Sequence, residues 1–401
     1  MGLIDGYHMM VISQYFSSFD DFISLEFVCK KFNTNMLKFH NNPIPLTTKT
    51  IKFFSKIETL NIWSKDDETF GNMNFGVIPI NQQDKIDFFR VKIWCPINYD
   101  LFQTLKKPNI VFKDLIYTKK DRIKYGNTIP KIITKLGREC FCDSEMTSID
   151  LPNSLTLVGE RCFTNCLLKA LMFTDNISRL GSYCFMNCGL LSSIHLPDRL
   201  AVLPKSCFEG CYSLQSVTFP SHITTIESAC FSQCSSLRTV DIPNSESLIL
   251  NCAFLSCSHL TSVSIKGNVR AFGNSCFCFC ESLVSIDIPS CVSRFDNDCF
   301  RCCKSLKRIV LPLNLREIPY CCFAGCLNLT GVAMPENLSA IGEAAFHNCK
   351  SLETLAIPNE VKVFKNQCFR GCVLLELTVP KTVKHIGDGC FVECKNIMFQ
   401  V

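Results

Sequence analysis

Phenylalanine recurs at an almost fixed interval through the last two-thirds of this chain, each time in the same local context. The intervals are 22, 22, then 23 eight times, then 22 residues. The phenylalanines are Phe141, Phe163, Phe185, Phe208, Phe231, Phe254, Phe277, Phe300, Phe323, Phe346, Phe369 and Phe391. So strict a period is typical of one supersecondary unit stacked on itself, and it argues against a globular domain built around a central active site.

Cysteines flank these phenylalanines at two fixed positions, which we call −1 and +3. Position −1 is Cys in ten units and Ala in two, Ala253 and Ala345; position +3 is Cys in eleven units and Ser144 in the first. Alanine replaces a packing cysteine easily but a metal ligand badly, so we interpret these cysteines as small buried side chains rather than metal ligands. Disulfides between neighbouring rungs are geometrically feasible, but they need an oxidising compartment.

A short alternating run follows in each unit, as in Ser285-Ile286-Asp287-Ile288, and usually ends in Pro. Alternation with period 2 predicts a strand with one buried face, and Pro ends the ladder because it has no N–H to donate. One such strand per unit, always in the same direction, predicts a parallel sheet along the array. We expect the Cys-Phe-x-x-Cys segment to return the chain through a short helical or 3₁₀ turn.

The repeat resembles a known family. Residues 332–352 read VAMPENLSAIGEAAFHNCKSL, which is similar to the BspA-like class of leucine-rich repeat, in the Cys-Phe-rich version found in parasitic amoebae. The resemblance covers residues 126–401 in about twelve units. It implies a leucine-rich repeat solenoid with the parallel sheet on the concave face, turns on the convex face and a binding role without catalysis. Some members of that family are surface adhesins and others have no export signal.

The first 45 residues follow a different pattern. Residues 8–16 are apolar and helix-like, and the spacing of Phe22, Leu25, Val28 and Phe32 predicts a second, amphipathic helix that begins at Asp20 or Asp21. The string from Tyr15-Phe16 to Val28-Cys29-Lys30-Lys31-Phe32 resembles the later part of an F-box, a helical motif that docks on adaptor proteins. The alternative is a helical cap that shields the first rung of the solenoid.

Residues 46–125 contain three strand-like segments, 57–63, 89–94 and 109–112. They lie about 20–30 residues apart, with polar loops between them, so we interpret them as divergent rungs that extend the same sheet. The predicted organisation is therefore a helical region at 1–45, divergent rungs at 46–125 and regular repeats at 126–401.

Several classes of function have no support in this sequence. It has no apolar run of about 18 residues and no secretory start, so we expect no membrane insertion and a cytoplasmic location; unconventional export to the cell surface is the alternative. The net charge of +5 is modest, and its excess lies before the repeats, so we expect no nucleic-acid binding. No P-loop, HExxH, GxSxG or GxGxxG motif is present. We therefore predict no catalytic residue, no cofactor and no metal site.

The predicted function is protein–protein interaction on the concave face of the solenoid. The register of the strands places Val310, Ala333 and Ala356 in an apolar stripe, with Arg308, Asp287 and Asp241 on the same face. These six residues are the candidate contact site for a protein partner. The N-terminal helices would make the chain an adaptor, and the alternative function is a surface or secreted adhesin.

The last segment, residues 397–401, has the register of a strand. An apolar edge strand is a template for another chain, so we expect either a weak homodimer through this C-terminal edge or a frayed, monomeric end.

Overall fold

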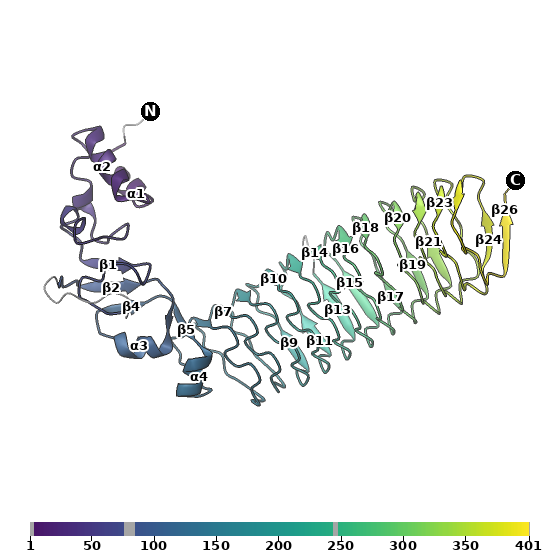
Figure 1. The fold of residues 1–401 in the computed structure, drawn as a ribbon, viewed down its shortest axis with the longest axis horizontal. Helices are drawn as coiled ribbons and strands as arrows, with labels where there is room; N and C mark the ends of the chain where they lie inside the picture. Colours follow the sequence, from purple (N-terminus) through teal and green to yellow (C-terminus); the bar gives the residue numbers. More distant parts are fainter. Residues whose placement is uncertain (1–3, 76–84, 244–247, 401) are drawn as a thin grey trace. The chain divides into compact units, whose positions relative to one another are not determined.

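The computed structural model describes residues 4–75, 85–243 and 248–400 (Figure 1). The chain divides into two compact units, Met1–Tyr117 with Ile132–Thr134, and Thr118–Lys131 with Lys135–Val401. Each unit is considered by itself below.

The N-terminal helices of the first unit are fixed by side chains at their starts. Helix α1 (Gly6–Ser13) follows Asp5, whose carboxylate accepts hydrogen bonds from the backbone N–H groups of Tyr7 and His8. Helix α2 (Phe19–Val28) begins with a capping box between Ser18 and Asp21. Such caps satisfy N–H groups that have no partner inside a helix. Both predicted helices are present with shifted bounds: α1 begins two residues before the predicted 8–16 segment, and α2 begins at Phe19 and ends at Val28, short of Phe32.

The remaining elements of the first unit include one three-stranded parallel sheet and a further pair of parallel strands. Strands β1 (Thr59–Ile62), β2 (Arg90–Ile93) and β4 (Ile110–Phe112) pair in that order, and they coincide with the three predicted strand segments. Strand β3 (Ile97–Asn98) pairs with β5 (Leu115–Tyr117). The other elements are helix α3 (Tyr99–Leu105) and the 3₁₀ helices Met36–Lys38 and Ile51–Phe53.

The second unit begins with helix α4 (Lys119–Tyr125) and continues as a parallel β-solenoid of about thirteen turns. Figure 1 shows two rows of strands along the array. The row of longer strands, which the sequence predicts, consists of β9 (Ser193–His195), β11 (Ser216–Thr218), β13 (Thr239–Ile242), β15 (Ser262–Ile265), β17 (Ser285–Ile286), β19 (Arg308–Val310), β21 (Gly331–Ala333), β24 (Glu376–Val379) and β26 (Asn396–Phe399).

A second row consists of two-residue strands, which the sequence analysis does not predict because two residues carry no readable alternation. These are β6 (Lys135–Leu136), β7 (Leu157–Val158), β8 (Arg179–Leu180), β10 (Val202–Leu203), β12 (Thr225–Ile226), β14 (Leu248–Ile249), β16 (Ala271–Phe272), β18 (Arg294–Phe295), β20 (Glu317–Ile318), β22 (Ala340–Ile341), β23 (Val363–Phe364) and β25 (His385–Ile386). Most described rungs therefore pair with a neighbour in one or both rows, and each row is divided into separate sheets.

The longer strands bury one face and expose the other. In β13, Val240 and Ile242 are buried while Thr239 and Asp241 are exposed. The strands pair in register, so Asp241 lies beside Ser264 of β15. Like side chains thus stack along the array, and the exposed ones form a continuous surface that we call the long-strand face.

The phenylalanines stack in one column through the core. Successive rings lie nearly parallel with centroids 5.2–5.6 Å apart, except for the last step, from Phe369 to Phe391, which is 6.1 Å. Phe141 to Phe369 are fully buried. Stacked rings add attraction beyond the area they bury, so this column holds each rung to the next.

The Cys-Phe-x-x-Cys segments are hydrogen-bonded turns rather than regular helices. In each unit the residues two before and two after the phenylalanine have positive φ, as at Arg161 (53°) and Asn165 (58°) around Phe163. The bonds of a 3₁₀ turn are present, as from Cys166 N–H to the Phe163 carbonyl, but they alternate with bonds to the next rung, as from Phe163 N–H to the Cys184 carbonyl. The left-handed residues stop a helix from continuing and keep the turn flat against its neighbours.

Cysteines at +3 have a role beyond filling space. Each of the eleven thiols at +3 donates a hydrogen bond to the carbonyl oxygen of the phenylalanine one rung earlier, at 2.9–3.2 Å. The residues at −1 are fully buried except Cys390, which is 3% exposed. The interpretation of both positions as packing cysteines is thus incomplete for +3, where the thiol is also a donor.

Candidate interaction surfaces

A groove opens on the long-strand face between β17 and β19. These two strands do not pair with each other: β17 ends the group β13-β15-β17, and β19 begins the pair β19-β21. The cavity at this interruption has a volume of about 350 Å³. Three of the predicted contact residues, Asp287, Arg308 and Val310, line it together.

The groove offers both charge and apolar surface to a partner. Asp287 and Arg308 are exposed, and neither forms an ion pair within the described ranges. Val310 is 71% exposed and Leu313, on the same groove, is 70% exposed. Exposed branched side chains beside unpaired charges are suited to protein recognition rather than to acid–base chemistry.

The other predicted contact residues lie on the same face but outside the groove. Ala333 of β21 is paired in register with Val310, and Ala356 is exposed further along the array. Asp241 lies on β13, where its carboxylate forms an ion pair with Lys266 at 2.9 Å. The charge of Asp241 is therefore partly balanced within the chain. Asp241 offers less negative charge to a partner than Asp287 does.

Leu313 is the most exposed apolar residue of the groove that the sequence analysis did not predict. It follows Pro312, at a position where other units carry polar turn residues such as Asp198, Ser290 and Asn359. Comparing that column from unit to unit would have shown one large apolar side chain among polar ones. The repeat pattern thus distinguishes Leu313 from its counterparts in other units, but only the structure shows that its side chain is exposed.

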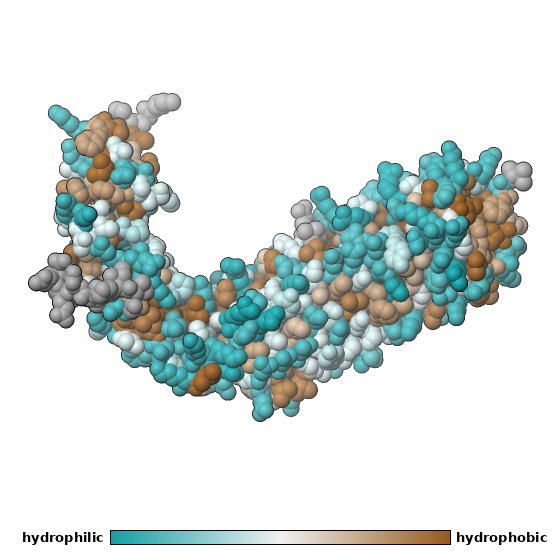
Figure 2. All heavy atoms as spheres, viewed as in Figure 1, coloured by the Kyte–Doolittle hydropathy of each residue, from teal (hydrophilic) through white to brown (hydrophobic). Residues whose placement is uncertain are grey.

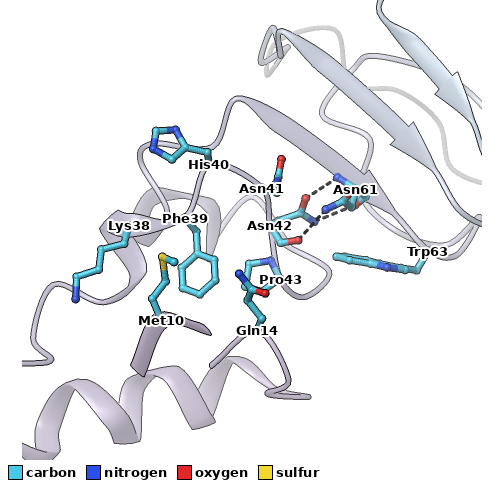
Figure 3. A pocket seen from close by; sticks show the side chains of 10 residues that line it. All are labelled: Met10, Gln14, Lys38, Phe39, His40, Asn41, Asn42, Pro43, Asn61 and Trp63. Carbon is cyan, nitrogen blue, oxygen red and sulfur yellow. Dashed lines mark hydrogen bonds between the residues drawn. The ribbon is translucent and has the colours of Figure 1, made fainter. Parts of the chain in front are cut away.

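A second hollow lies in the first unit, between α1 and β1 (Figure 3). Its volume is about 420 Å³, and Met10, Phe39 and Trp63 supply its apolar lining. Asn42 closes one side: its amide oxygen accepts from the backbone N–H of Asn61 and its amide nitrogen donates to the Asn61 carbonyl at 2.9 Å. The side chain of Asn42 thus adds hydrogen bonds at the outer edge of β1, beside the backbone bridge between Asn41 and Thr59.

Apolar side chains are also exposed on the N-terminal helices. Tyr15 is 86% exposed just after α1, and Phe27 and Val28 at the end of α2 are 85% and 71% exposed. Figure 2 shows hydrophobic residues on the surface around α1 and α2. This is the part of the chain that resembles an F-box.

Two classes of site are absent from the described part of the chain. No group of three or more His, Cys, Asp or Glu residues there could hold a metal ion. Nor does any helix in the described ranges have the length and apolar character needed to cross a bilayer.

The fold is a leucine-rich repeat solenoid with a short repeat. It has two rows of parallel strands, equivalent residues of successive units stack on one another, and the phenylalanines form a column in the core. A family model described as the BspA type leucine rich repeat region (6 copies) matches residues 125–238, 179–305 and 272–398. The chain therefore belongs to the BspA-type leucine-rich repeat family, as its sequence resemblance implies.

One solved structure has a similar fold, and a second was found at a lower TM-score. A leucine-rich repeat protein from Bacteroides ovatus ATCC 8483 is 24% identical, with 78% of this chain and 84% of that chain covered and a TM-score of 0.53. A leucine rich cell surface protein from Faecalibacterium prausnitzii A2-165 is 22% identical, with 68% and 87% covered and a TM-score of 0.41. No curated protein matches this sequence.

Proposed function

We propose that this chain is a non-enzymatic scaffold that binds a protein partner on the long-strand face. The observation that supports this most directly is the groove between β17 and β19, where Asp287, Arg308 and Val310 meet. Unpaired charges orient a partner, and the apolar stripe from Val310 to Ala333 supplies surface to bury. Repeat solenoids present such extended surfaces and commonly use them for binding.

A photo-crosslinking amino acid placed at Val310 tests this proposal in the native cell. We expect one specific protein to be captured from position 310 and not from Val202, a 40% exposed valine on the short-strand row. Binding of that protein, once purified, should then depend on Arg308 and Asp287. Equal capture from both positions would contradict the proposal.

A second candidate role, as an adaptor, is favoured by the exposed apolar residues of the N-terminal helices. In this role α1 and α2 dock on an F-box-binding adaptor protein while the repeats hold a client. Substituting Tyr15→Asp with Phe27→Asp should abolish binding of such a purified adaptor. The matched control is Ile123→Asp, at a 74% exposed position on α4, which should leave binding unchanged.

The alternative role is a surface or secreted adhesin. The state of the cysteines in the native compartment distinguishes it from a cytoplasmic scaffold, because disulfides persist only where the surroundings are oxidising. All 29 cysteines are free thiols in this structure. Alkylation of all of them in protein taken directly from its cells supports the cytoplasmic role, and a ladder of disulfides supports export.

A further inference from the structure

Cys368 and Cys390 occupy the −1 position of the last two rungs, and their thiols touch. The Cys368 thiol donates to the Cys390 sulfur at an Sγ–Sγ distance of 3.7 Å, and the Cys390 thiol donates to the Lys365 carbonyl at 3.1 Å. Neighbouring rungs in register lie about 4.8 Å apart, inside the Cα–Cα range of a disulfide. The two residues can therefore be linked with little movement of the backbone.

The surroundings of this pair differ from those of the interior cysteines. The ring step from Phe369 to Phe391 is 6.1 Å, wider than every other step in the column. Ile386 is 37% exposed, whereas the matching residue one rung earlier, Phe364, is fully buried. The last rung is therefore packed less tightly, and local opening exposes Cys390 more readily than its counterparts.

We propose that Cys368 and Cys390 form a redox site that reacts with a small disulfide such as glutathione disulfide. This inference goes beyond the proposed function and does not depend on it. The Cys390 thiolate attacks one sulfur of glutathione disulfide, giving a mixed disulfide and releasing one glutathione thiolate. Cys368 loses its proton and attacks the Cys390 sulfur, so the Cys368–Cys390 bond forms and the second glutathione leaves. Two protein thiols are oxidised and one glutathione disulfide is reduced to two glutathione thiols.

Electrostatics assign the roles within the pair. The hydrogen bond from Cys368 lowers the pKa of Cys390 to about 7, against the opposing effect of burial. Burial and the same hydrogen bond raise the pKa of Cys368 well above its ordinary value. An attacking thiol with a pKa near the ambient pH combines thiolate content with nucleophilicity, so Cys390 attacks first and Cys368 resolves.

The test uses the reduced 401-residue protein exposed to glutathione disulfide, then denatured and alkylated. We expect the loss of two alkylatable thiols and a peptide that links Cys368 to Cys390. In Cys390→Ala the link is absent; alanine already stands at this position in two other rungs, so the fold should tolerate it. In Cys368→Ala the reaction should stop at the mixed disulfide, leaving glutathione on Cys390.

The matched control is Cys322→Ala, at the −1 position of an interior rung, which should keep the Cys368–Cys390 link. Oxidation should also slow amide exchange in β25 and β26, because a covalent bond then ties the last rung to its neighbour. The proposal is overturned if all thiols of the wild-type protein remain alkylatable, or if Cys299 and Cys322 become linked as fast as Cys368 and Cys390.

Discussion

The thiol of Cys280 donates a hydrogen bond of 3.2 Å to the carbonyl oxygen of Phe254, one rung earlier in the array. The same contact recurs at every cysteine of the +3 column. It explains a difference between the two cysteine columns. Position −1 accepts alanine in two units, whereas every +3 residue, Cys or Ser144, carries a donor group.

Substitution at the two columns should therefore have unequal effects on stability. Cys280→Ala removes both a packed sulfur and a donor to a buried carbonyl, and we expect a loss of about 1–3 kcal/mol in the free energy of unfolding. Cys276→Ala, at −1 of the same unit, should cost less because only packing is lost. Denaturant titration of the two variants measures the difference. Equal losses in the free energy of unfolding would show that the thiol hydrogen bonds do not contribute to stability.

Loss of a ring from the phenylalanine column should act locally. Phe254 is stacked on both sides at 5.5 and 5.6 Å, so Phe254→Ala should cost about 3–5 kcal/mol and loosen the central rungs. Phe391 has one stacked neighbour, at 6.1 Å, and Phe391→Ala should mainly fray the last rung. Hydrogen exchange resolved along the chain measures this, because stability in a stacked array is close to a nearest-neighbour sum. Uniform loss of protection in both variants would contradict that expectation.

Charge placed on the apolar stripe should weaken partner binding without unfolding the protein. Val310→Asp with Ala333→Asp puts two carboxylates on adjacent exposed positions of β19 and β21, where they would be desolvated in the complex. We expect affinity for the captured partner to fall by at least about tenfold, which corresponds to about 1.4 kcal/mol. Val202→Asp serves as the control. Unchanged affinity in the double variant, with its thermal unfolding also unchanged, would place the contact elsewhere.

Alkaline pH should destabilise the repeat array through its buried thiols. Burial raises the pKa of Cys140 and Cys257 to about 12 from an ordinary value of 9.0, and that of Cys166 to about 11. Above pH 9 these thiols ionise in the unfolded chain while they stay neutral in the folded one. The unfolded state then binds fewer protons, so the free energy of unfolding falls as pH rises.

Each such thiol contributes a slope of up to about 1.4 kcal/mol per pH unit. Denaturation midpoints measured from neutral pH into the alkaline range should therefore drop steeply. In Cys257→Ala the decline should be shallower by one such slope, since one titrating thiol is gone. A midpoint that does not change with pH would mean that these thiols ionise equally in both states.

The C-terminal edge predicts weak self-association of the 401-residue chain. Strand β26 exposes Met398 (52%) and Phe399 (60%), and Figure 2 shows hydrophobic residues gathered at this end of the array. Light scattering at increasing concentration should reveal a dimer that Phe399→Lys removes, because a lysine on an edge strand opposes pairing. A monomer at all concentrations, unaffected by the substitution, would leave a frayed end instead.

Much of the architecture follows from the sequence alone, because a stacked repeat has to place the same residue type at the same depth in every rung. The interval between Phe141 and Phe391 predicts the core column, and the alternation in runs such as 285–288 predicts the longer strands and their exposed residues. These are local patterns repeated many times, so each unit confirms the interpretation of the others.

Tertiary structure alone decided the features that depend on how one rung meets the next. The short-strand row, the hydrogen bonds from the +3 thiols and the edge closed by Asn42 all join atoms about 20 residues or more apart in the chain. The groove beside Arg308 lies where β17 and β19 do not pair, and the alternation of residues along each strand does not reveal which neighbouring strands stay unpaired. The period of the sequence determines which side chains face outward. The spacing between rungs is set by packing, and it determines where a groove forms on the long-strand face.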